Sequence, residues 1–141
     1  FNFLTASAEE ERERFFRISR LRQIRPRAFI MEGKRKWYRF LIRQLMVTHY
    51  SYLEQKLDRK PYTDELSGSW YDELYEPALR LYRKENVGQS FTAFYRHWMK
   101  SWHRQIVRHM KRRGYVRTIS LEESFYRYLE KKRRKRYDKS S

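Results

Sequence analysis

The segment FYRHWMKSWHRQIVRHMKRRG, residues Phe94–Gly114, repeats two kinds of side chain at helical spacing. One stripe is apolar and recurs every four residues: Phe94, Trp98, Trp102 and Ile106. A second stripe with the same spacing is basic: Arg96, Lys100, Arg104, Arg108 and Arg112. At about 100° per residue each stripe stays on one side of a helix, so the segment predicts an amphipathic helix with a core-facing apolar face and a separate basic face.

Apolar residues recur at helical spacing along most of the chain, and glycine and proline are sparse, with four and three residues. This pattern predicts an all-α fold, a compact bundle of about five helices. The predicted helices span residues 7–25, 34–57, 63–85, 90–114 and 120–130. Because 141 residues lie within the usual size of one domain, we expect a single helical domain over residues 1–130. A basic flexible tail is expected over residues 131–141.

Local signals support these helices. Ser7 with Glu10, and Ser120 with Glu123, have the spacing of a capping box at a helix start. Pro77 lies inside the third predicted helix and predicts a kink there, because proline lacks the backbone N–H. The core-facing stripe predicted for the second helix is Trp37, Phe40, Leu41, Leu45, Thr48 and Tyr52.

The charge of the chain points to a polyanionic partner. The formal net charge is +17, from 34 Lys or Arg against 17 Asp or Glu. Such a charge is typical of proteins that bind DNA, RNA or an anionic membrane surface. Between Glu85 and Glu122 there are eight Lys or Arg and no acidic residue. Since like charges at i,i+4 destabilise a helix, this stripe favours a phosphate-rich ligand over a purely solvated face.

We expect three groups of basic residues to contact phosphates. The second helix contributes Arg35, Lys36, Arg39 and Arg43. The fourth helix and the turn after it contribute Arg96, Lys100, Arg104, Arg108, Lys111, Arg112, Arg113 and Arg117. The tail contributes Lys131, Lys132, Arg133, Arg134, Lys135 and Arg136. Contacts of this kind are largely independent of base sequence and weaken with salt, because each neutralised phosphate releases counterions.

Catalytic chemistry is not indicated. The absence of cysteine excludes disulfides, thiolate metal sites and thiol nucleophiles. His97, His103 and His109 are six residues apart, which scatters them around a helix. Asp72 and Glu76 share a helix face and have the chemistry to bind Mg²⁺, but pairing with nearby Arg or Lys is favoured. Without a Gly-rich phosphate loop or a nucleophile elbow, we expect no enzyme activity, no cofactor and no metal.

A membrane role is also disfavoured. No apolar run approaches the roughly 18 residues of a membrane span. The predicted helix with Trp98 and Trp102 is amphipathic and basic, as are helices that lie on a membrane surface. The other predicted helices, however, need its apolar face to complete a core.

The segment SWYDELYEP, residues Ser69–Pro77, resembles the SWYD-x-x-Y-x-P core of a bacterial helical domain of unknown function, which occurs in some proteins beside ParB-like modules. The earlier RISRLRQIRPRAFI, residues 17–30, is similar to the lead-in of that domain. The matching positions are His49, Ser69, Trp70, Tyr71, Asp72, Tyr75, Pro77, Ser120, Glu122 and Glu123. The resemblance implies a helical fold and favours a DNA-binding regulator or partitioning accessory. The fourth helix departs from it, because it is uniformly basic here and mixed in charge in the family.

The sequence therefore predicts a non-catalytic nucleic-acid-binding protein that contacts the phosphate backbone through basic helical faces. We expect it to work with other protein subunits in a larger nucleoprotein assembly, RNA-guided or ribosome-associated, or as a DNA-binding regulator. The expected location is cytoplasmic or nucleoid-associated. The alternative is a protein-interaction module that docks an acidic protein partner.

Overall fold

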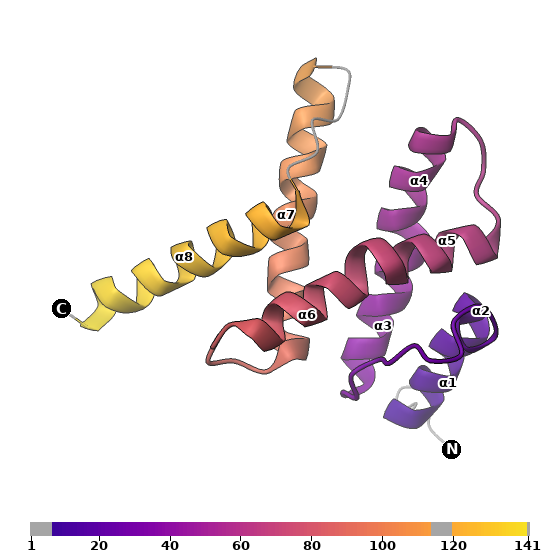
Figure 1. Ribbon diagram of the computed structural model, residues 1–141, viewed down its shortest axis with the longest axis horizontal. Coiled ribbons are helices and arrows are strands. Elements are labelled where there is room, and N and C mark those ends of the chain that lie inside the picture. The colour runs from indigo at the N-terminus through magenta and orange to yellow at the C-terminus, as the bar shows by residue number, and fades with distance from the viewer. Residues whose placement is uncertain (1–6, 114–119, 141) are drawn as a thin grey trace. The chain divides into compact units, whose positions relative to one another are not determined.

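The computed structural model describes the backbone of residues 7–113 and 120–140, and the side chains of residues 7–104 and 120–135. Every regular element in these residues is a helix, as Figure 1 shows, which confirms the predicted all-α class. The chain divides into two compact units, Phe1–Tyr75 and Glu76–Ser141, called here the first and second unit. The sequence predicts one domain over residues 1–130, so this division is a difference from that expectation.

The helices of the first unit come in three groups separated by short connections. They are α1 (Ala8–Ser19), α2 (Leu21–Ile24), α3 (Arg35–Arg43), the π-helical segment η2 (Gln44–His49), α4 (Tyr50–Leu57), α5 (Thr63–Trp70) and the π-helical segment η3 (Tyr71–Tyr75). α1 packs against α3, and α5 packs against α2 and η2. The core between them is aromatic and aliphatic, with Phe15, Leu21, Leu41, Leu45 and Trp70 fully buried.

The first predicted helix is broken near its end. Ser7 caps α1 as predicted, since its Oγ accepts a hydrogen bond from the N–H of Glu10 at 3.1 Å. The helix then ends at Arg20, which has a left-handed backbone (φ 56°) and donates its N–H to Phe16. Ser19 Oγ accepts from the N–H of Leu21 and starts the short α2. A left-handed residue ends a helix efficiently because it turns the chain while satisfying the last carbonyls.

The π-helical segment η2 changes which residues face the core. Before η2, the predicted residues Trp37 and Leu41 are buried, as is Leu45 within it, whereas Phe40 is half-buried. After Leu45 the predicted stripe is displaced by one residue, because His49 and Leu53 are buried while Thr48 and Tyr52, the next members predicted by α-helical spacing, are only half-buried. Hydrogen bonds run i→i+5 in a π-helix, so the segment takes up extra chain relative to the α-helical period.

The second unit contains α6 (Glu76–Lys84), α7 (Phe91–Arg113) and α8 (Leu121–Ser140), and each pair of these helices is in contact. Ser120 caps α8 as predicted, accepting from the N–H of Glu123 at 3.1 Å. The core is a cluster of aromatic rings in which Phe125 of α8 packs edge-on against Phe94 and Trp98 of α7, with centroids 5.6 and 5.2 Å apart. These contacts fix the face of α7 that is turned inward.

Two local expectations concern Pro77 and the C-terminal tail. Pro77 is the second residue of α6, and the π-helical segment η3 ends two residues before it. Proline has no backbone N–H, so the change from π-helical to α-helical structure occurs next to the position that lacks a donor. The expected flexible tail from residue 131 is instead part of α8, which continues to Ser140. The reason is local: the segment lacks glycine and proline, and Glu130 pairs with Arg134 one turn on at 2.6 Å.

Candidate nucleic-acid interface

The positive charge is divided unequally between the two units. Residues 76–141 carry 19 Lys or Arg against 6 Asp or Glu, a net charge of +13. Residues 1–75 carry 15 against 11, a net charge of +4. The second unit therefore holds most of the excess charge of the chain, and its electrostatic field is the stronger attractor for a polyanion.

The described part of the basic stripe of α7 lies outside the core, as its spacing predicts. Phe94 and Trp98 are fully buried, and Trp102 is half-buried. On the outer side, Lys100 and Arg104 are exposed and Arg96 is half-buried. α7 contains no acidic residue, and no described carboxylate pairs with these three cations. Their charge is therefore available to an external anion.

The predicted residues of α8 fall into different environments. Lys131, Arg133 and Lys135 are exposed. Arg134 is also exposed, but it pairs with Glu130. The ammonium of Lys132 lies over the ring of Phe94, 5.5 Å from its centroid, so this residue connects α8 to α7 and is half-buried.

On α3 of the first unit, the predicted residue Arg39 is already paired. Arg39 Nε lies 3.4 Å from Oε1 of Glu11, a buried carboxylate on α1, so its charge helps to hold α1 against α3. Arg35 is half-buried, whereas Lys36 and Arg43 are exposed. The remaining predicted residues lie outside the described side chains: Arg108, Lys111, Arg112, Arg113, Arg117 and Arg136.

His97 belongs to the same surface, whereas its spacing in the sequence bears only on metal binding, which it disfavours. It is exposed on α7 next to Arg96 and one turn before Lys100. Desolvation lowers the pKa of His97, and repulsion from Lys132, Arg96 and Lys100 lowers it further. The sequence does carry a signal for this role of His97, because cations flank it at i−1 and i+3.

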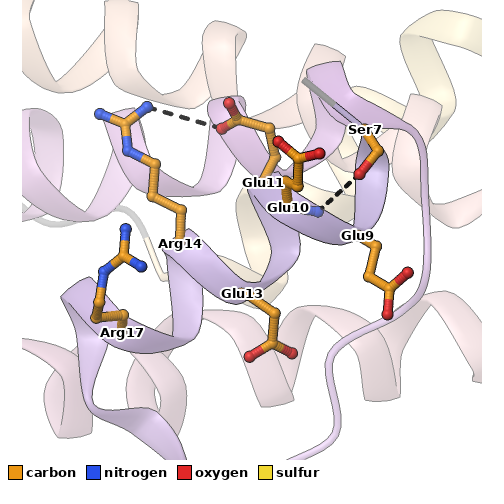
Figure 2. A pocket seen from close by; sticks show the side chains of 7 residues that line it. All are labelled: Ser7, Glu9, Glu10, Glu11, Glu13, Arg14 and Arg17. Carbon is orange, nitrogen blue, oxygen red and sulfur yellow. Dashed lines mark hydrogen bonds and ion pairs between the residues drawn. The ribbon is translucent and has the colours of Figure 1, made fainter. Parts of the chain in front are cut away.

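An acidic pocket at the start of α1 contrasts with this surface. Figure 2 shows its lining, in which the Ser7–Glu10 cap and the ion pair of Arg14 with Glu11 are marked. The lining residues are Ser7, Glu9, Glu10, Glu11, Glu13, Arg14 and Arg17. Carboxylates are favourable at the positive end of a helix dipole, and here they repel phosphate. This pocket is therefore not part of the candidate interface.

The SWYD segment holds the first unit together. Asp72 accepts two hydrogen bonds from Arg25, at 3.0 and 2.6 Å. The hydroxyls of Tyr71 and Tyr75 accept from the backbone N–H groups of Phe29 and Met31, at 3.0 and 2.8 Å. These contacts fix the connection between α2 and α3, and they give the motif an architectural role.

Two further residues of this segment make side-chain hydrogen bonds. The indole N–H of Trp70 donates to Oε1 of Gln44 at 3.1 Å, with both side chains buried. Ser69 Oγ lies 3.0 Å from Nε2 of His49 and donates to Glu73 at 2.8 Å. Because Ser69 donates its hydroxyl proton to Glu73, its oxygen is the acceptor in the contact with His49. We therefore place a proton on Nε2 of His49, which donates to Ser69 Oγ.

The favoured alternative to a carboxylate metal site is confirmed, because Asp72 pairs with Arg25 and Glu76 pairs with Arg80. Within the described part of the chain, no three His, Asp or Glu side chains are grouped to hold a metal ion. Nor is any helix in that part both long and apolar enough to cross a membrane. Comparisons of the chain with protein-family models, curated proteins and solved structures give no match, so the resemblance to the SWYD domain stays a prediction.

Proposed function

We propose that this chain is a non-catalytic nucleic-acid-binding protein whose second unit contacts the phosphate backbone through the exposed cations of α7 and α8. The observation that carries the proposal is the outer face of α7, where Arg96, Lys100 and Arg104 follow one another at i,i+4 with no described carboxylate partner. Three like charges at i,i+4 spacing repel one another and destabilise an isolated helix. A row of phosphates that binds these cations offsets this repulsion.

The ion pairs of the first unit can be compared with those of the second. Its acidic residues pair with its basic ones across helices: Glu13 with Arg22 at 3.2 Å, Asp64 with Arg20 at 3.2 Å, and Glu11 with Arg39 at 3.4 Å. In the second unit the described pairs join residues one turn apart on α6 or α8, and none involves α7. The uncompensated charge of α7 is therefore a specific feature of that helix.

The proposed ligand is the sugar-phosphate backbone rather than a particular base sequence. Arginine and lysine on a helix face position a protein on the backbone but do not read bases. We place the protein in the cytoplasm or on the nucleoid, within a larger nucleoprotein assembly or as a DNA-binding regulator. An acidic protein partner is the competing outcome of the test.

The test compares three ligands of equal length: single-stranded RNA, single-stranded DNA and duplex DNA, each titrated at several salt concentrations. We expect binding to weaken with salt, with a slope of about −0.7 to −0.9 for each phosphate contact. The variant Arg96→Gln/Lys100→Gln/Arg104→Gln should lose affinity and reduce the magnitude of the slope by about two to three.

A matched control removes the same charge from exposed residues of the first unit, with Arg17→Gln/Arg27→Gln/Lys60→Gln. This control should keep most of the affinity, which separates a local interface from general electrostatic attraction. Equal losses in the two triple variants, or no binding of any of the three ligands, would refute the proposed interface.

A further inference from the structure

We propose that the edge of the α7–α8 contact is a binding site for one backbone phosphate, in which His97 donates a hydrogen bond as the imidazolium. Arg96 and Lys100 lie beside His97 on α7, and Lys132 of α8 adds positive charge from a buried position. The inference rests on the proposed function and deepens it, since it assigns a specific phosphate site and couples its occupation to the uptake of a proton.

The placement of His97 on α7 puts it between two cations. Around a helix axis, Phe94 and Lys100 lie about 60° to either side of His97, at about 100° per residue. Phe94 carries the ammonium of Lys132 over its ring at 5.5 Å, so this cation of α8 approaches His97 from one side. Lys100 approaches from the other side, with Arg96 one turn before it.

The position of Lys132 follows from the packing of α8. Phe125 and Leu129 are buried on the face of α8 that meets the core, and Tyr128 packs edge-on against Phe94 at 5.5 Å. Lys132 is one turn beyond Tyr128 and therefore continues the same face, with its Nζ buried over the ring of Phe94. A lysine held over an aromatic ring keeps its charge at a fixed place, which favours binding of an anion there.

The donors of the site suit a phosphate. Arg96 is half-buried, and its Nε is shielded from solvent and makes no hydrogen bond to any described group. His97 is exposed and therefore accessible to a ligand. Guanidinium, ammonium and imidazolium groups all donate charge-assisted hydrogen bonds to phosphate oxygens.

The electrostatics of His97 make the site sensitive to its ligand. Desolvation lowers the pKa of His97, and the cations that face it, Lys132 from α8 with Arg96 and Lys100 from α7, lower it further. Tyr128 of α8 lies beside them, and burial raises the pKa of its hydroxyl, so it stays neutral in the same range. No described group of α6 contributes to the pKa of His97. A phosphate that offsets these cations therefore raises the pKa of His97, and binding takes up a proton.

The experiment uses the whole chain and a 12-nucleotide oligothymidylate, because thymine does not titrate between pH 5.5 and 8. The pKa of His97 is followed by NMR from its imidazole Cε1–H signal, with and without the oligonucleotide. We expect the oligonucleotide to raise the pKa by about one unit, so that affinity at pH 5.5 exceeds affinity at pH 8 by up to about tenfold through this residue.

The controls separate this site from general binding. His97→Gln should remove the pH dependence of affinity, whereas His103→Gln, at another exposed position of α7, should retain it. Lys132→Gln should raise the pKa of His97 in the free protein and weaken binding. If the oligonucleotide binds but leaves the pKa of His97 unchanged, the phosphate site is wrong and the proposed function stands. If it does not bind at all, both are wrong.

Discussion

Arg25 and Asp72, 47 residues apart, form a two-pronged ion pair in which Nε and Nη2 lie 3.0 and 2.6 Å from the two carboxylate oxygens. The pair joins the end of α2 to η3, and the Arg25 guanidinium lowers the pKa of Asp72. Both side chains are about half exposed, so water screens the attraction. We expect Asp72→Asn to lower the free energy of unfolding of the first unit by roughly 0.5–1 kcal/mol.

The measurement is urea unfolding at low and high salt. Because a screened ion pair weakens with salt, the difference between Asp72→Asn and the unchanged protein should shrink at 1 M NaCl. Glu54→Gln on α4, for which no described ion pair is present, is the control. A salt-independent difference would mean that shape rather than charge makes Asp72 important.

The buried tyrosine hydroxyl at residue 75 predicts a larger effect. Tyr75 is fully buried, and its oxygen accepts the backbone N–H of Met31 at 2.8 Å. Tyr75→Phe leaves that N–H without its acceptor, which we expect to cost about 1–2 kcal/mol of unfolding free energy. Tyr50→Phe, at a half-buried position, should change it by less than about 0.5 kcal/mol. Hydrogen exchange of the Met31 amide reports the site directly, and unchanged exchange in Tyr75→Phe would contradict the prediction.

The buried imidazole of His49 predicts a pH dependence of stability. Burial lowers the pKa of His49 to about 4, with Glu73 opposing the shift and Lys56 adding to it. The unfolded chain, with a pKa near 6.5, binds the proton first, so stability is full above about pH 6.5 and falls as the pH drops toward 4. We expect a loss of about 1.3 kcal/mol between pH 7.5 and pH 5.5 from this residue.

His49→Gln isolates this contribution, because glutamine keeps an N–H donor for Ser69 but does not titrate. The free energy of unfolding is measured by urea titration at pH 7.5, 6.5 and 5.5, above the range where carboxylates take up protons. The variant should show a shallower pH dependence than the unchanged protein by the stated amount. Parallel pH curves for the two proteins would show that His49 is protonated equally in the folded and unfolded states.

The sequence predicts those features of the fold that depend on neighbouring residues. Ser7 and Ser120 accept the predicted hydrogen bonds at the starts of α1 and α8, because a cap involves only the next three residues. The displacement of the core stripe from Thr48 to His49 is not predictable in this way. It depends on the π-helical segment η2, which packs against α5, and no local signal marks it.

In the candidate interface, too, the sequence predicts what depends on neighbouring residues but not what depends on tertiary packing. The exposure of Lys100 follows from spacing alone, whereas the pairing of Arg39 with Glu11 joins α1 to α3 and needs their packing. Lys132 is similar, since its place over Phe94 depends on how α8 meets α7. The sequence identifies which residues carry charge, and the tertiary contacts decide which of those charged groups interact with other residues of the chain.

The hydrogen bond between Trp98 and Ser124 predicts the stability of the second unit. The indole N–H donates to the serine hydroxyl at 3.0 Å, and both side chains are buried. Ser124→Ala leaves that N–H unpaired in an apolar surrounding, which should cost about 1–2 kcal/mol of unfolding free energy. Ser101→Ala, at a half-buried position of α7, is the matched control and should be nearly neutral. Equal effects from the two substitutions would indicate loss of serine packing rather than of the hydrogen bond.

The repulsion along α7 predicts that salt stabilises the second unit. Arg96, Lys100 and Arg104 form two like-charged i,i+4 pairs, each costing about 0.2–0.5 kcal/mol at low ionic strength. At 0.5 M NaCl the Debye length falls to roughly 4 Å, so most of this cost should disappear. The triple glutamine variant should therefore be more stable than the unchanged protein at 0.05 M NaCl by about 0.5–1 kcal/mol, and equally stable at 0.5 M. Thermal unfolding at the two salt concentrations measures both differences. A triple variant that is less stable at low salt would mean that the α7 cations stabilise the folded chain, and would remove the main argument for an external anionic ligand.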